Sequence, residues 1–154
     1  MFESGWMPTS RPTARGMTMG RGGYKKRRAD PARDGGAFMA LPWAVVDSHA
    51  YRSLSHTARS LFIDIARQYN QKNNGRLLAS KNFLRQRGWH SSDVIHRALR
   101  QLLDSGLIYM TVQGHRPNKA SWFALTYYDL FDDPRFDPNA FQGFRRGAYK
   151  KSIP

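Results

Sequence analysis

The chain of 154 residues contains no cysteine and only 11 acidic residues. Without cysteine, neither a disulfide framework nor a zinc site with thiolate ligands can form. The sequence also lacks a long apolar run: its most apolar early stretch, residues 38–46, is interrupted by Pro42. That stretch is too short to span a bilayer, and it lacks the apolar segment of a signal peptide. We therefore expect a cytoplasmic protein with one folded domain and no membrane partner.

Basic residues greatly outnumber the few acids. The chain has 25 lysines and arginines, which give a formal net charge of +14. A charge so far from zero bears on partners rather than on fold, and the abundant polyanions of a cytoplasm are DNA and RNA. Residues 37–126 alone hold 12 basic and 4 acidic residues. The excess charge therefore lies largely in the part expected to fold, as a docking surface requires.

Two flanking segments differ in composition from this central part. Residues 1–36 are rich in Gly, Arg, Pro, Ser and Thr without any helical or strand period, which predicts a flexible basic arm. Such an arm either follows phosphates and enters a minor groove, or serves only as a solubilising leader. Residues 127–154 form a C-terminal extension in which aromatics and acids give way to a basic tail. We expect its aromatic part, 127–144, to lie across the domain or against a second protein. The basic cluster of the arm consists of Lys25, Lys26, Arg27 and Arg28.

The folded part opens with short elements and one clearly periodic helix. Residues 38–41 suit a short strand or an extended lead-in, Pro42 opens a short helix that reaches Val46, and residues 48–54 are expected to form a turn. Ser55 is placed to cap the following helix, whose apolar residues recur at helical spacing. These apolar residues are Ala58, Leu61, Phe62, Ile65, Ala66 and Tyr69.

The next stretch predicts a helix, a turn, a second helix and a hairpin. Ser80 can cap a short helix over residues 81–87, and Ser91 or Ser92 can cap a longer one over 92–105 that ends before Gly106. Two strands, 107–112 and 120–126, enclose a loop at 113–119. A third strand, 76–79, follows the turn signal at 73–75 and can complete a three-stranded antiparallel sheet. The fold class that this order predicts is α+β.

The longer helix and the loop both present polar, basic side chains. The helix buries its apolar side, so its opposite face has the shape and charge that a B-DNA major groove accepts. The alternative is a solvated face with ordinary i,i+4 ion pairs. The loop contains no acid and can reach phosphates or a minor groove, although hairpin tips are often charged simply because they are exposed. The candidate contacts are Ser91, Ser92, Asp93, His96, Arg97 and Arg100 on the helix, and His115, Arg116 and Lys119 in the loop.

Residues 38–126 resemble the winged helix-turn-helix proteins of bacteria, phages and mobile elements. The resemblance implies a three-helix core with a small antiparallel hairpin or three-stranded sheet, flanked here by basic flexible tails. It also implies that the candidate helix residues face base edges or phosphates and that the candidate loop residues lie in the wing. The segments that carry the resemblance are residues 54–59, 73–75, 87–89 with 91–92, 102–108 and 114–119.

The function expected on these grounds is sequence-specific binding of double-stranded DNA by a small, nucleoid-associated transcriptional regulator of a phage or other mobile element. The sequence is compatible with a homodimer as well as a monomer, because many helix-turn-helix proteins dimerise on palindromic sites. The same features are compatible with a protein-binding module that acts on a host complex, with a replication accessory protein, and with an RNA-binding protein. An enzyme is not expected, and neither is a metal or cofactor, because no phosphate-cradling glycine loop, metal triad or nucleophile–base spacing is present.

Overall fold

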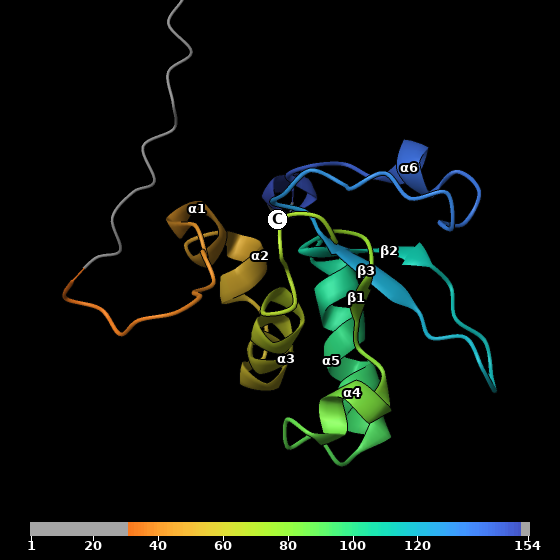
Figure 1. Cartoon of the computed structure of the whole chain (residues 1–154), viewed down its shortest axis with the longest axis horizontal. Helices are drawn as coiled ribbons and strands as arrows, with labels where there is room; N and C mark the ends of the chain where they lie inside the picture. Colours follow the sequence, from red (N-terminus) through yellow and green to blue (C-terminus); the bar gives the residue numbers. More distant parts are fainter. Residues whose placement is uncertain (1–30, 152–154) are drawn as a thin grey trace, which may run out of the picture. The chain divides into compact units, whose positions relative to one another are not determined.

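The computed structural model describes residues 31–151 of the chain. The basic cluster at 25–28 and nearly all of the predicted arm therefore lie outside the described residues. Residues from Ala37 onward form one compact α+β unit, drawn in Figure 1. Its elements are α1 (Trp43–Val46), α2 (His49–Arg52), α3 (His56–Ala66), β1 (Leu77–Leu78), α4 (Lys81–Arg85), α5 (Ser92–Asp104), β2 (Ile108–Val112), β3 (Trp122–Leu125), α6 (Ala140–Gly143) and a 3-10 helix, η1 (Ala148–Lys151).

The sheet has three antiparallel strands in the order β1-β3-β2. β3 lies in the centre, where Phe123 pairs with Leu77 of β1 and Leu125 pairs with Ile108 of β2. An irregularity between Met110 and Val112 shifts the register just before the hairpin loop. The three-stranded antiparallel sheet expected from the sequence is confirmed, although β1 is shorter than the expected strand over 76–79.

The core lies between α3, α5 and one face of the sheet. The apolar side of α3 is fully buried, as its period predicts, and Ser55 caps the helix by accepting a hydrogen bond from the Ala58 backbone N–H at 3.2 Å. Full burial of a side chain the size of Phe62 or Leu102 contributes roughly 1.5–3 kcal/mol. Tyr69 follows the helix rather than belonging to it, and its ring stacks on Tyr128 at 4.0 Å. Burial of large apolar side chains therefore holds α3 and α5 against the sheet.

The turn expected over residues 48–54 is wrong, because this segment contains the one-turn helix α2. Ser48 caps it by accepting from the Tyr51 N–H at 3.2 Å, and Ala50 is buried. One cap and one small buried residue suffice for a single turn, which is too short to show a helical period. Residues 38–41 form no strand and are an extended lead-in to α1, whose N-cap is Pro42.

The C-terminal extension packs against the same sheet. At the β1 side, the Phe131 N–H donates to the Asn74 carbonyl at 3.0 Å, and at the β2 side the Asp137 N–H donates to the Thr111 carbonyl at 3.0 Å. Further along, the ring of Phe144 meets that of Tyr109 edge to face at 5.7 Å. Figure 1 shows this segment passing along the sheet and carrying α6 beside β2. Residues 127–151 thus cover the outer edge of β2 instead of forming a separate body.

Two buried polar side chains fasten the extension. The side-chain amide of Asn74 pairs with the backbone of Leu125 as a neighbouring strand would. Its Oδ1 accepts from the Leu125 N–H at 2.7 Å, and its Nδ2 donates to the Leu125 carbonyl at 3.0 Å. The same Nδ2 donates to the Asp129 carbonyl at 2.9 Å. Asp133 accepts two side-chain hydrogen bonds and a backbone hydrogen bond from Arg135, which hold the pKa of Asp133 well below its usual value. If the extension left the sheet, Asn74 would lose its hydrogen bond to Asp129, and Asp133 would lose its ion pair with Arg76, which lies 3.5 Å away just before β1.

Candidate nucleic-acid interface

α4 begins as the sequence predicts and ends earlier. Ser80 caps it by accepting from the Phe83 N–H at 3.4 Å. The expected end at residue 87 is wrong, since the helix ends at Arg85. Beyond it, the Arg87 and Trp89 N–H groups both donate to the Leu84 carbonyl, at 2.9 and 3.1 Å, and this tightens the last turn. The chain then turns at residue 88 toward α5.

Asp64 of α3 holds this turn in place. Its Oδ1 accepts from Arg87 Nε at 2.5 Å, and its Oδ2 accepts from the Trp89 indole N–H at 2.7 Å. No sequence pattern predicts this role of Asp64, because both of its partners lie more than twenty positions further along the chain. One carboxylate on α3 thus fixes the connection between α4 and α5.

α5 presents the polar face that its period predicts. Ser91 is the cap, as its Oγ accepts from the Val94 N–H at 3.4 Å, and Ser92 is the first helical residue. Gly106 ends the helix region with φ +72°, and a Cβ there would lie 3.0 Å from the Ala148 backbone. The residues of α5 that are exposed are Asp93, His96, Arg97, Arg100 and Asp104.

The i,i+4 ion pairs of the alternative interpretation do not form on this face of the described structure. Within residues 31–151, neither Arg97 nor Arg100 takes part in an ion pair. Both guanidinium groups therefore remain available to an external acceptor. An arginine so placed can donate two parallel hydrogen bonds to a phosphate or to a guanine edge.

The hairpin loop is held by its own backbone. His115 and Lys119 exchange N–H···O=C hydrogen bonds of 2.9 and 3.0 Å, and the Gly114 N–H donates to Ser121 Oγ at 2.9 Å. A Cβ on Gly114 would lie only 2.5 Å from the Lys119 carbonyl oxygen, so this close approach requires glycine. The tip, including Arg116, is exposed.

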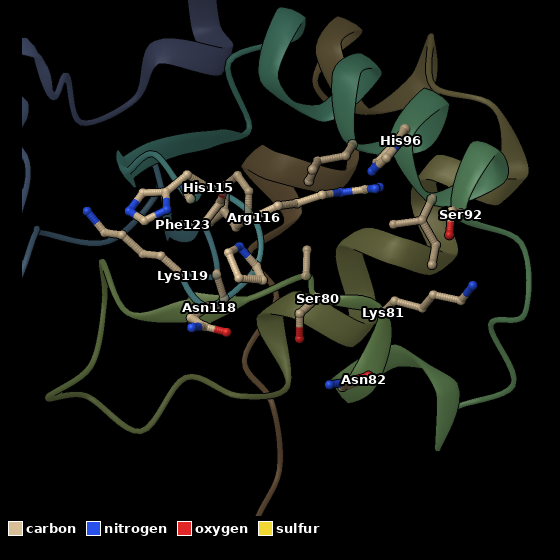
Figure 2. Close-up of a pocket in the computed structure, with 17 residues that line it drawn as sticks. Ser80, Lys81, Asn82, Ser92, His96, His115, Arg116, Asn118, Lys119 and Phe123 are labelled. Atoms are coloured by element: carbon tan, nitrogen blue, oxygen red, sulfur yellow. Dashed lines mark hydrogen bonds between the residues drawn. The ribbon is translucent and has the colours of Figure 1, made fainter.

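A basic groove of about 570 Å³ lies between the start of α4, one flank of α5 and this loop. Figure 2 shows Lys81 and Ser92 at one end of the groove, His115 and Lys119 at the other, and Arg116 extending from the loop toward α5. No aspartate or glutamate of the described residues lines it. The apolar floor includes Ile95, Leu99 and Phe123, and the polar lining includes Ser80, Lys81, Asn82, Ser92, His96, His115, Arg116, Asn118 and Lys119.

Five predicted contact residues share this groove, namely Ser92, His96, His115, Arg116 and Lys119. Four others, Ser91, Asp93, Arg97 and Arg100, are exposed on α5 or at its cap but do not line the groove.

Sequence reasoning missed Ser80, Lys81 and Asn82 as groove residues. The signal that could have found them is the cap at Ser80. It marks the start of α4, and the first helical turn of α4 lies beside α5 in the groove. Their contribution gives the groove a cationic side on α4 as well as on the loop.

Neither a membrane helix nor a metal cluster is found among residues 31–151. No helix in that range combines the length and apolarity needed to cross a bilayer. No group of three or more histidines and acids in the same range converges as a metal site would require.

Comparisons of the chain with protein-family models, with curated proteins and with solved structures find no match, so the residues themselves carry the argument on function.

Proposed function

We propose that this chain is a winged helix-turn-helix protein that binds double-stranded DNA sequence-specifically, as a small nucleoid-associated transcriptional regulator of a phage or other mobile element. In this proposal α5 enters the major groove and the wing, residues 113–119, lies on the backbone or in the minor groove. The observation that carries it is the groove between α4, α5 and the wing. Within the described part of the chain, the lysines and arginines that line this groove are Lys81, Arg116 and Lys119, and no acidic residue lines it.

Two kinds of contact follow from this arrangement. Arg97 and Arg100 project from α5 without ion pairs to any residue of 31–151, so they are suited to base edges, where a good bidentate contact discriminates by about 1–3 kcal/mol. The groove cations are suited to phosphates, which add affinity without sequence information. The wing and α4 would then orient the protein while α5 reads the sequence.

The proposal is tested by measuring affinity for fragments of the source replicon and for random duplex at near-physiological salt. A specific regulator binds one fragment about 10³-fold or more tightly than random duplex. Arg100→Ala is then expected to reduce that ratio, whereas Lys119→Ala is expected to weaken binding to all duplexes alike. Arg52→Ala removes one positive charge from an exposed position of α2, away from the groove, and is the matched control.

Equal binding of every duplex, released together as salt rises, would contradict sequence-specific regulation. Equal losses on specific and random DNA for both Arg100→Ala and Lys119→Ala would contradict the division between α5 and the wing. Competition with duplex RNA in the same titration distinguishes an RNA-binding protein, whose groove geometry differs.

Exposed aromatics favour a second candidate, binding of protein through residues 127–144. Phe141 on α6 is 54 % exposed and Phe131 is 41 % exposed, and aromatic side chains are enriched at protein interfaces. The partner would be a host or replication complex, or a second copy of the chain in a homodimer. Sedimentation of the unaltered protein and of Phe141→Ser distinguishes these cases. Concentration-dependent association that Phe141→Ser abolishes supports the homodimer, and photocrosslinking from position 141 in host cells tests a different partner.

A further inference from the structure

Asp137 of the C-terminal extension lies at the base of the wing and makes three contacts there, two with the wing and one with β2. Its Oδ2 accepts from the Gln113 N–H at 2.5 Å, and its Oδ1 lies 3.6 Å from Lys119 Nζ. Its own N–H donates to the Thr111 carbonyl of β2 at 3.0 Å. One residue of the extension therefore touches the end of β2, the first residue of the wing and the last cation of the wing.

The position of Asp137 is fixed by backbone hydrogen bonds on either side. The Phe136 N–H donates to the Asp133 carbonyl at 3.2 Å, and the Asp137 carbonyl accepts from the Ala140 N–H at 3.0 Å, where α6 begins. The backbone of Asp137 is therefore held in place, and the hydrogen bond from the Gln113 N–H keeps its short carboxylate side chain at the wing. The more mobile member of the pair is Lys119, whose ammonium lies at the end of a flexible four-carbon stem; the two side chains are similarly exposed, at 43 % for Lys119 and 37 % for Asp137.

The pair places Asp137 in competition with a phosphate for Lys119. A lysine ammonium is a point charge on a flexible stem, so it can move from the carboxylate to a phosphate oxygen. An exposed ion pair is weak and screened by salt, so the exchange lowers affinity without abolishing binding.

We infer that Asp137 is a positioning residue that fixes the start of the wing and limits its hold on nucleic-acid phosphates. This inference rests on the proposed DNA-binding function and identifies a regulating residue outside the helix-turn-helix. The hydrogen bond to Gln113 orders the loop, and the negative charge opposite Lys119 weakens sequence-independent binding. Weaker binding to random duplex favours discrimination between the specific site and other DNA, because competing non-specific sites are abundant.

The two roles are separable with different substitutions. Asp137→Asn removes the charge but keeps an oxygen that accepts from Gln113, whereas Asp137→Ala removes both. Asp132→Asn is the matched control, because Asp132 lies in the same extension, is exposed and does not line the groove. Lys119→Gln removes the cation with which Asp137 pairs.

The experiment measures the affinity of the full chain for a random 20-base-pair duplex, together with amide hydrogen exchange of the free protein. Asp137→Asn is expected to bind about threefold to tenfold more tightly than the unaltered chain, and Asp132→Asn to stay within about twofold. In a Lys119→Gln background, Asp137→Asn is expected to have no more effect than Asp132→Asn. The Gln113 amide is expected to stay protected in Asp137→Asn and to lose protection in Asp137→Ala.

Equal affinities of Asp137→Asn and Asp132→Asn would overturn the role of the charge, and so would an effect that persists without Lys119. A Gln113 amide that exchanges equally fast in the unaltered chain and in Asp137→Ala would overturn the positioning role. Failure of the proposed function is distinguishable, since the unaltered chain would then bind no duplex, or bind specific and random duplexes alike, while the exchange of Gln113 could still be read in the free protein.

Discussion

Replacing Asp64 with alanine tests whether one carboxylate holds the connection between α4 and α5 in place. The substitution removes the acceptor for the Trp89 indole and for the Arg87 guanidinium. A hydrogen bond to a charged group contributes about 1.5–3 kcal/mol to stability. The Arg87 side chain is 30 % exposed, so its ion pair adds less than about 1 kcal/mol. We therefore expect Asp64→Ala to lower the free energy of unfolding by about 2–3 kcal/mol.

Urea unfolding followed by circular dichroism, with linear extrapolation to water, measures this loss. Asp47→Ala, at an exposed acid just before α2, is the control and should change stability by less than about 0.5 kcal/mol. Trp89→Phe removes the indole N–H together with part of the ring, and only the N–H depends on Asp64, so the substitution should cost less in the Asp64→Ala background than alone. Equal losses for Asp64→Ala and Asp47→Ala, or strict additivity with Trp89→Phe, would refute the reasoning.

Three further substitutions test the packing of the extension and the end of α5. Asn74→Ala should lower the free energy of unfolding by about 3 kcal/mol in urea, because the backbone N–H and C=O of Leu125 lose their partner in the sheet. Gly106→Ala should cost about 2 kcal/mol and lower Tm by several degrees, because an alanine at φ +72° is strained and its Cβ meets backbone. The folded pKa of Asp133 is depressed, so its contribution to stability is complete above its unfolded pKa of about 3.9 and is lost as the pH falls. Unfolding free energies between pH 7 and pH 3 should therefore fall less for Asp133→Asn than for the unaltered chain, whereas Asp132→Asn should follow the unaltered chain.

Local chemistry made several elements predictable. The caps at Ser55 and Ser80 were predicted, and the closing glycine at 106 was predicted, because each satisfies backbone groups only a few residues away. The period of α5 likewise predicted which side is buried, including Ile95 and Leu102. The one-turn α2 escaped prediction because a single turn carries no period.

The candidate site was only partly predictable. The cations of the wing and the polar face of α5 were identified from their positions in expected elements, whereas Lys81 and Asp64 were not. Lys81 joins the groove because α4 starts beside α5, and Asp64 reaches Trp89 because α3 packs beneath the turn. Both placements depend on how the helices pack against one another, and no local sequence pattern predicts that packing.

The sequence by itself determined the order of elements from α3 to β3, the caps of their helices and the excess of positive charge. These features depend on hydrogen bonds between near neighbours, on apolar periodicity and on composition, all of which are readable along the chain. The tertiary structure alone decided that the extension is fastened by the hydrogen bond from Asn74 to Asp129 and by the ion pair between Arg76 and Asp133, and that Asp137 meets Lys119. Those contacts join residues distant in the sequence, so their partners become defined only when the extension is laid across the sheet and its buried polar groups find acceptors and donors.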